Sequence, residues 1–101
     1  MITKEKILEP KLKRKVEDLG GLCLKWVSPS FTGVPDRIIL MPGGRIYFAE
    51  IKTTGKDLFQ RQKFVKRQLE RLGFIVWKVD SDVELMKFIV YLSKNKQNDE
   101  L

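Results

Sequence analysis

The chain has 101 residues, of which 43% are hydrophobic, a length and composition that fit one domain with a single core. Lysine and arginine outnumber aspartate and glutamate by 20 to 13, and the net charge of +7 favours a polyanionic partner such as nucleic acid, although a basic protein without that role can have the same balance. The lack of histidine and the single cysteine exclude internal disulfides, ordinary zinc sites and all catalysis that depends on an imidazole.

The first elements expected along the chain are a helix and a short strand. Apolar residues recur at helical spacing from about Ile7 to Leu19, and two glycines then end the helix. Pro10 is compatible with this helix only in its first turn or at a kink. The strand covers Leu22 to Val27, where Cys23 is more typical of a small core residue than of a nucleophile.

A β-hairpin is expected in the middle of the chain. A loop over residues 28–35 precedes a strand from Arg37 to Met41, a Pro-Gly-Gly turn follows, and a second strand runs from Arg45 to Lys52. The second strand has apolar residues on both faces, a pattern typical of a strand in the middle of a covered sheet.

The remaining expected elements are a helix, a strand and a last helix. The helix runs from about Leu58 to Leu72 and ends at Gly73. Ile75 to Val79 predicts a fourth strand, and a capping box at 81–84 opens a helix that continues to about Ser93.

The order α-β-β-β-α-β-α implies an α/β domain, more closely α+β, built on one mixed sheet with flanking helices. We expect the domain to cover residues 1–94 and a frayed polar tail to cover 95–101. No apolar run approaches the roughly 20 residues that span a bilayer, and the first residues lack an apolar signal core. The expected protein is soluble, intracellular and cytoplasmic, with no membrane partner.

Two charged residues end the strand that the sequence places in the middle of the sheet. Glu50 and Lys52 are two positions apart, so they project from the same face. Burying a charge is costly unless it is paired, so their presence there needs a cause. A simple ion pair within reach of water is one explanation, and a catalytic site is another.

The hairpin brings a second carboxylate to the same place. If Met41 pairs roughly with Arg45 across the turn, Asp36 comes opposite the region of Glu50 to Lys52. Neighbouring carboxylates raise each other's pKa and are stable together only with a cation between them, and one lysine neutralises only one of them. Oxygen ligands without histidine or thiolate select Mg²⁺ or Mn²⁺, so the sequence predicts a site for a hard metal ion.

Basic residues on segments that border this site are expected to hold a nucleic-acid backbone and not to read bases. Lys25 is the strongest of them, because it interrupts an apolar strand and can face the site; for each one, a solvated surface charge is the alternative. The predicted residues are Lys25, Arg37, Lys56, Arg61 and Lys63.

The last helix is apolar on nearly all sides from Val83 to Leu92. One face packs on the sheet, and the surplus would leave an exposed apolar patch on so small a monomer. Such a patch usually marks an interface, so we expect a homodimer. A protein-interaction subunit that uses this helix is an alternative.

Two motifs carry a resemblance to a known family. Gly33-Val-Pro-Asp-Arg-Ile38, followed by Phe48-Ala-Glu-Ile-Lys52, resembles the VRR-NUC family of the PD-(D/E)xK nuclease superfamily. The similarity extends from about Glu9 through Asp80. It implies a restriction-endonuclease-like α-β-β-β-α-β core, followed here by a C-terminal helix.

The resemblance implies roles for the residues that match the motifs. Asp36 and Glu50, with the backbone carbonyl of Ile51, would hold Mg²⁺, for which Mn²⁺ could substitute. Lys52 would orient the attacking water or help to deprotonate it, and would stabilise the pentavalent phosphate. The metal ion would lower the pKa of bound water and so replace the missing histidine base.

The resemblance also implies two further site residues. Glu9 lies where the family has a glutamate in its first helix, and it would complete the metal site. Pro10 beside it departs from the pattern; Glu5 and Glu17 are less favoured substitutes. Gln62 falls in the apolar seam of the second helix and would contact water or the scissile phosphate. For Gln62 the alternative is a buried amide satisfied by backbone groups.

The activity that the resemblance implies is hydrolysis of phosphodiester bonds by a metal-dependent DNA endonuclease. Stand-alone, phage-type members resemble Holliday-junction resolvases, and a two-fold dimer would present two cutting centres to a two-fold substrate. We therefore expect branched DNA, above all the four-way junction, as the partner. A non-catalytic or broadly unspecific DNA-binding module on the same fold is the alternative.

Overall fold

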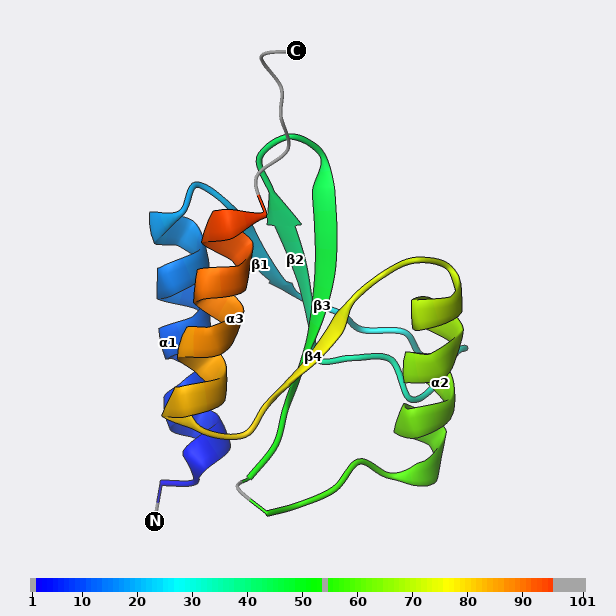
Figure 1. Ribbon diagram of the computed structural model, residues 1–101. Coiled ribbons are helices and arrows are strands. Elements are labelled where there is room, and N and C mark those ends of the chain that lie inside the picture. The colour runs from blue at the N-terminus through cyan, green and yellow to red at the C-terminus, as the bar shows by residue number, and fades with distance from the viewer. Residues whose placement is uncertain (1, 54, 96–101) are drawn as a thin grey trace.

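A four-stranded mixed sheet with helices on both faces forms the protein, in a computed structural model that describes residues 2–53 and 55–95 (Figure 1). The elements in chain order are α1 (Lys4–Asp18), β1 (Leu22–Lys25), β2 (Arg37–Met41), β3 (Arg45–Ile51), α2 (Gln60–Arg71), β4 (Val76–Val79) and α3 (Asp82–Lys94). The predicted order of elements and the α+β class are confirmed. Most of the predicted tail, residues 96–101, lies outside the described residues.

The sheet has the strand order β1-β2-β3-β4, in which β1, β2 and β3 are antiparallel and β4 is parallel to β3. Met41 pairs with Arg45 across the turn, the register that the sequence predicted. Residues 47–51 of β3 are all buried, as predicted for a central strand. This register decides which residues of β2 and β3 meet at the far end of the hairpin.

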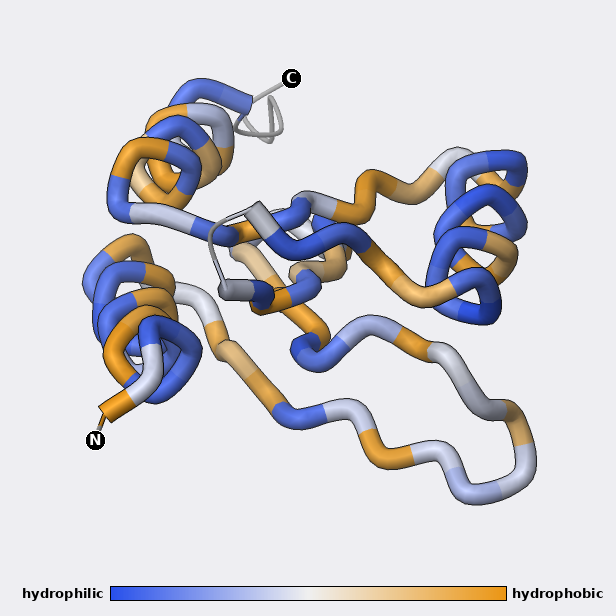
Figure 2. Tube along the Cα trace, turned by 90° about the horizontal axis from the view of Figure 1, so that it is seen from below, coloured by the Kyte–Doolittle hydropathy of each residue, from blue (hydrophilic) through white to orange (hydrophobic). Residues whose placement is uncertain are grey.

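The two faces of the sheet are covered differently. α1 and α3 lie side by side on one face, and α2 lies alone on the other (Figures 1 and 2). The main apolar cluster lies under α1 and α3 and includes the fully buried ring of Phe88. On the opposite face Val65 is the buried residue of α2, and a small group of rings covers the sheet: Trp26, Phe48 and Phe74.

Helix α1 begins three residues earlier than predicted, at Lys4. The Thr3 hydroxyl caps it by accepting a hydrogen bond from the amide of Lys6 (3.3 Å). The apolar periodicity begins only at Ile7, so it missed the polar first turn. Pro10 consequently lies inside the helix and beyond its first turn, which was one of the two positions that the sequence allowed, and it cannot donate the usual bond to the carbonyl of Lys6.

Several other boundaries differ from the prediction by one or two residues, and two of these differences matter most. β1 ends at Lys25 and not at Val27, although the Trp26 amide still donates to the carbonyl of Asp36 (3.0 Å). Leu72 caps α2 and is exposed, so the apolar face of α2 is narrower than predicted. No helix in the described part of the chain is long and apolar enough to cross a membrane.

Candidate active site

Asp36 and Glu50 meet where β2 begins and β3 nears its end. Arg37 pairs with Ala49, so the next pair outward along the hairpin is Asp36 with Glu50. The Asp36 carboxylate accepts a hydrogen bond from the amide of Ile51 (2.8 Å), which fixes it beside β3. Ala49 and Ile51 belong to the cluster under α1 and α3, so Glu50 between them faces the side of α2.

Glu50 is a buried acid with an unsatisfied oxygen. The residue is 2% exposed, and its Oε1 atom has no hydrogen-bond partner among the residues that the structure describes. Burial, followed by the hydrogen bond and the negative charge of Asp36, raises the pKa of Glu50 from 4.5 to about 9. The positive charge of Lys52 acts in the opposite direction but does not cancel these effects. Without a further cation, Glu50 therefore keeps its proton at neutral pH.

Lys52 follows β3 directly and closes the group of three predicted catalytic residues. Its amide donates to the carbonyl of Val79 (3.0 Å), while its ammonium lies over the ring of Phe59, 4.5 Å from the ring centroid. Within residues 2–53 and 55–95 Lys52 forms no ion pair, so the simple Glu50–Lys52 ion pair is not what the structure contains. Phe59, which is 72% exposed, was not predicted as a site residue.

A recess of about 350 Å³ opens beside Lys52. Its lining comes from the start of α1 and from the loop between β3 and α2. The residues are Glu5, Lys52, Thr53, Lys56, Asp57 and Phe59. We call it the mouth of the site, since it lies next to the strand end that carries Glu50.

The backbone carbonyl of Ile51 receives no hydrogen bond from the residue opposite it on the β2 side, because that residue is a proline. Residues 48 and 52 donate their amides to the β4 side, at Ile75 and Val79, so Ile51 directs both its amide and its carbonyl toward β2. Continuing the β2–β3 register places Pro35 opposite Ile51. Proline has no N–H group, so Pro35 cannot donate to this carbonyl. The Pro-Asp pair thus contributes a carboxylate and, at position 35, no amide that could occupy the Ile51 carbonyl beside it.

The two acids on one side of α1 have different partners. The carboxylate of Glu9 bonds to the guanidinium of Arg37 (3.0 Å). Glu5 accepts a hydrogen bond from the Thr53 hydroxyl (2.9 Å), and its charge is among those that raise the pKa of Glu50. Glu5 is therefore the acid of α1 whose charge acts on the pKa of Glu50, whereas the sequence favoured Glu9 for the site. The cap at Thr3, which extends the helix to include Glu5, is the sequence signal that was missed.

Gln62 is half-buried, and its side-chain oxygen accepts a hydrogen bond from the amide of Phe59 (2.9 Å) at the start of α2. This bond satisfies one of the free amides at the helix N-terminus. Gln62 does not line the mouth of the site. The arrangement matches the alternative in which backbone groups satisfy the amide.

Two of the predicted DNA-binding residues lie on the other face of the sheet. Lys25 pairs with Arg37 in the β1–β2 register, so both side chains share the face that α1 covers, opposite Glu50. The expectation that Lys25 faces the site is therefore wrong. Arg37 is 8% exposed and donates to Glu9 and to the carbonyl of Cys23 (3.2 Å), so its guanidinium is a buried structural group and not a free phosphate ligand.

Arg61 fastens the loop after β1 to α2. Its guanidinium donates to the carbonyl of Thr32 (3.0 Å) and lies over the rings of Phe31 and Phe64, 5.0 and 5.1 Å from their centroids. Gly33 has a φ of +85°, and a Cβ atom there would lie 2.6 Å from the Arg61 side chain. The glycine that begins the motif is thus needed both for the turn and for this close approach.

The last two predicted DNA-binding residues lie on the same face of the sheet as the candidate site. Lys56 is exposed at the mouth. Lys63 forms an ion pair with Asp57 (2.8 Å). Of the five predicted cations, Lys56 is thus the one that combines a position at the mouth with a free ammonium among the described residues.

The oxygen atoms gathered here fit Mg²⁺. Within the described residues no group of three histidine, cysteine or acidic side chains is placed to hold an ion, so the side-chain donors are two carboxylates. Mg²⁺ is usually held by one or two carboxylates and keeps several waters, so this number is sufficient. Among the described residues the unpartnered Oε1 of Glu50 lies beside Asp36 and the backbone of Ile51, and oxygen donors of this kind fit such an ion.

Comparisons with known proteins agree on the kind of domain, although no family model matches the sequence. The chain is 36% identical over 80 residues to "Putative nuclease p44" of Acyrthosiphon pisum secondary endosymbiont phage 1, a match that covers 79% of this chain and 86% of that protein. It is also similar to a solved structure described as a VRR_NUC domain, with a TM-score of 0.84 and 28% sequence identity. That match covers 89% of this chain and 98% of the other, so the similarity extends over nearly the whole domain.

Proposed function

This chain belongs to the VRR-NUC family of nucleases, and we propose that it is a metal-dependent endonuclease that hydrolyses phosphodiester bonds of DNA. The observation that carries the proposal is the buried carboxyl of Glu50, which has a second carboxylate beside it and an oxygen without a partner in the described part of the chain. Such a pair is costly in a fold this small unless a cation binds there. Phosphodiester hydrolysis is the chemistry that a dication and a lysine at one strand end support.

Asp36, Glu50 and the carbonyl of Ile51 would hold Mg²⁺, or Mn²⁺ in its place. When bound, the ion supplies positive charge that lowers the pKa of water and stabilises negative charge on the phosphate. Glu50 loses its proton on binding, because a neighbouring cation reverses the shift that burial causes. The Asp36 carboxylate stays oriented by the Ile51 amide.

Lys52 acts from the solvent side of the same strand end. Its ammonium leaves the ring of Phe59 and donates hydrogen bonds to the attacking water or to a phosphate oxygen. A cation–π contact at an exposed ring is worth only about 0.5–1 kcal/mol, so this movement is inexpensive. The ammonium stabilises the transition state more than the ground state, because the phosphate gains negative charge during the reaction.

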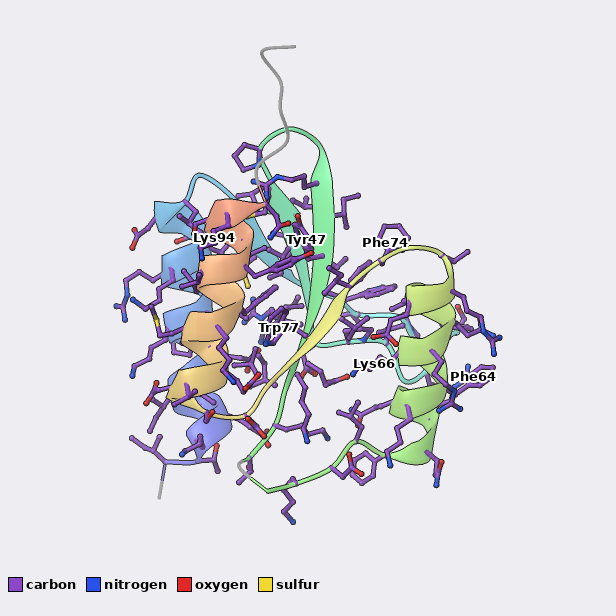
Figure 3. The ribbon with its side chains drawn as sticks, in the orientation of Figure 1. Tyr47, Phe64, Lys66, Phe74, Trp77 and Lys94 are labelled. Carbon is purple, nitrogen blue, oxygen red and sulfur yellow. The ribbon has the colours of Figure 1, made fainter. Side chains whose placement is uncertain are left out.

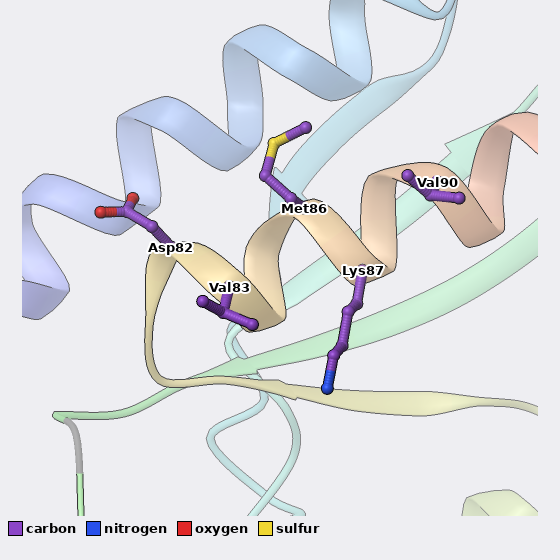
Figure 4. A pocket seen from close by; sticks show the side chains of 5 residues that line it. All are labelled: Asp82, Val83, Met86, Lys87 and Val90. Carbon is purple, nitrogen blue, oxygen red and sulfur yellow. The ribbon is translucent and has the colours of Figure 1, made fainter.

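We propose branched DNA, with the four-way junction as the preferred form, and a homodimer as the working assembly. Val83, Met86 and Val90 expose apolar side chains along one side of α3, which Figure 4 shows together with Asp82 and Lys87. Because α3 lies on the face opposite α2, a dimer through α3 leaves both sites open to substrate. A strict monomer in sedimentation at micromolar concentration would contradict the dimer.

The nuclease proposal is tested with a labelled four-way junction and a linear duplex of the same sequence, incubated with Mg²⁺. We expect the wild type to cut the junction faster, and Asp36→Asn to lose at least about 10²–10³-fold in rate while it still binds the junction. The control is Asp18→Asn, which removes the same charge from an exposed position at the end of α1 and should cut normally.

Each contrary outcome removes a different part of the proposal. Binding by the wild type without any cutting supports the non-catalytic module. Equal cutting of duplex and junction removes the selectivity and leaves the nuclease. Cutting that persists in excess EDTA removes the metal dependence.

A further inference from the structure

Positive charge is concentrated on the helix that covers the side of the candidate site. α2 carries five basic residues and one acidic residue. α1 carries six basic and four acidic residues, and α3 carries two of each. Figure 2 shows the predominance of hydrophilic positions along α2. Much of the net charge of the chain therefore lies on the face where Glu50 is directed.

Part of this charge converges on a cavity of about 260 Å³ between α2 and β4. The acidic side chains in its lining are Asp57 and Glu70, both exposed, and Asp57 is already paired with Lys63. Figure 3 shows Lys66 in the space between α2 and the sheet. The basic side chains of the lining are Lys63, Lys66, Arg67 and Lys78.

Three of these basic side chains lack an acidic partner among the described residues. Lys66, Arg67 and Lys78 form no ion pair within the part of the chain that the structure describes. Lys66 and Lys78 are half-buried, so salt screens their mutual repulsion less than it would on an open surface. An anion in the cavity would offset this repulsion.

The cavity adjoins the mouth of the candidate site. Asp57 lines both the cavity and the mouth that contains Lys52. Lys78 stands beside Glu50 in the parallel register of β3 and β4, so both side chains share one face of the sheet. A strand whose phosphate is cut beside Glu50 and Lys52 can therefore reach the cavity with a neighbouring phosphate.

We propose that the cavity formed by Lys66, Arg67 and Lys78 is a binding subsite for a backbone phosphate of the DNA strand being cut, adjacent to the scissile phosphate. The inference rests on the proposed nuclease function. The cavity is several times larger than the ~30 Å³ that one water occupies in the liquid, so it has room for a phosphodiester group. Because lysine and arginine contacts to phosphate carry no sequence information, the subsite strengthens binding to any sequence.

The test compares Lys66→Gln/Lys78→Gln with Arg14→Gln/Lys15→Gln, which removes two charges from α1 on the other face of the sheet. Binding to labelled junctions of two unrelated sequences is measured by anisotropy in EDTA between about 50 and 200 mM salt. Loss of one neutralised phosphate lowers the slope of log affinity against log salt by about 1, so we expect a loss of roughly 1 and about tenfold weaker binding for the first variant alone. The single variant Arg67→Gln, at an exposed helix position where the side chain is not needed for packing, should weaken binding and lower the slope by part of the same amount.

Equal slopes for the cavity and control variants would overturn the subsite while wild-type cutting still supports the nuclease. A wild type that neither binds nor cuts DNA would remove the proposed function itself. If inorganic phosphate, at the same phosphate concentration, protects the wild type from thermal unfolding as strongly as DNA does, the cavity is a free-phosphate site and the subsite proposal fails.

Discussion

The two faces of the sheet use buried side chains for different purposes. Under α1 and α3 the cluster is apolar and closed, and its rings pack on one another, as Trp77 does on Phe88 at 5.2 Å between centroids. Under α2 the aromatic layer is thinner, Val65 is the buried residue of the helix, and Glu50 lies at the edge of the layer. Figure 3 shows Trp77 on the α3 side of the sheet and Phe74 on the α2 side.

One face of this small domain therefore mainly stabilises the fold, and the other carries the residues of the candidate site. A buried acid without a partner destabilises the fold, and a small domain has little stability to lose. We call the face under α1 and α3 the closed face and the face under α2 the open face. Apolar burial on the closed face offsets the destabilisation that Glu50 causes on the open face. The comparison is useful because substitutions on the two faces should have separable effects.

The largest separable effect is expected for Phe88→Ala. Phe88 is 0% exposed at the centre of the closed face, so its truncation should lower the free energy of unfolding by about 3–5 kcal/mol. The matched control is Phe64→Ala on α2, whose partly exposed ring contacts Arg61 and should cost less than about 1 kcal/mol. Urea denaturation measures both. Equal losses would show that the open face contributes to stability as much as the closed one.

The next effect concerns Glu50 and depends on pH. The folded protein keeps the Glu50 proton up to a pKa of about 9, while the unfolded chain releases it near 4.5. Between these values unfolding releases a proton, so the stability of the metal-free protein should fall as pH rises, by at most about 1.4 kcal/mol per pH unit. Glu50→Gln should remove this dependence and stabilise the metal-free protein near pH 8 by roughly 1–3 kcal/mol.

Thermal unfolding between about pH 5 and 9 in EDTA measures the dependence on Glu50. Excess Mg²⁺ should flatten the wild-type profile, because the ion binds the deprotonated carboxylate, and should leave the Glu50→Gln profile unchanged. A wild-type stability that rises with pH in EDTA would mean that the buried carboxyl is already ionised. The acid pair would then be stable without a metal ion.

The sequence predicted most of this arrangement because the deciding patterns are local. The Pro-Gly-Gly turn and the hairpin register place Asp36 opposite Glu50, and the structure has that register. The side on which Lys25 lies was also within reach of sequence reasoning. Cys23, two residues earlier in the same strand, was already interpreted as a core residue, and residues two apart share a face.

Other features of the site could not be predicted, because they depend on how loops and elements pack against one another. The ammonium of Lys52 rests on Phe59, and Arg61 holds a loop about thirty positions earlier in the chain. The pairing of Arg37 with Glu9 depends on how α1 crosses the sheet. Periodicity predicts which face of an element is buried, but not which charged groups meet once the elements pack.

The smallest expected effects are those of the two acids of α1, and they show which acid stabilises the fold and which acts on the metal site. Glu9 bonds to the buried Arg37, so we expect Glu9→Gln to cost about 1 kcal/mol of stability and to leave Mn²⁺ affinity unchanged. Glu5→Gln should weaken Mn²⁺ binding severalfold, because Glu5 adds negative charge near Glu50, and should leave stability nearly unchanged. Calorimetric titration with Mn²⁺ and urea denaturation of both variants give the two readouts. If Glu9→Gln weakens the metal and Glu5→Gln does not, the Glu9–Arg37 pair opens on binding, and an acid of the closed face takes part in the chemistry of the open one.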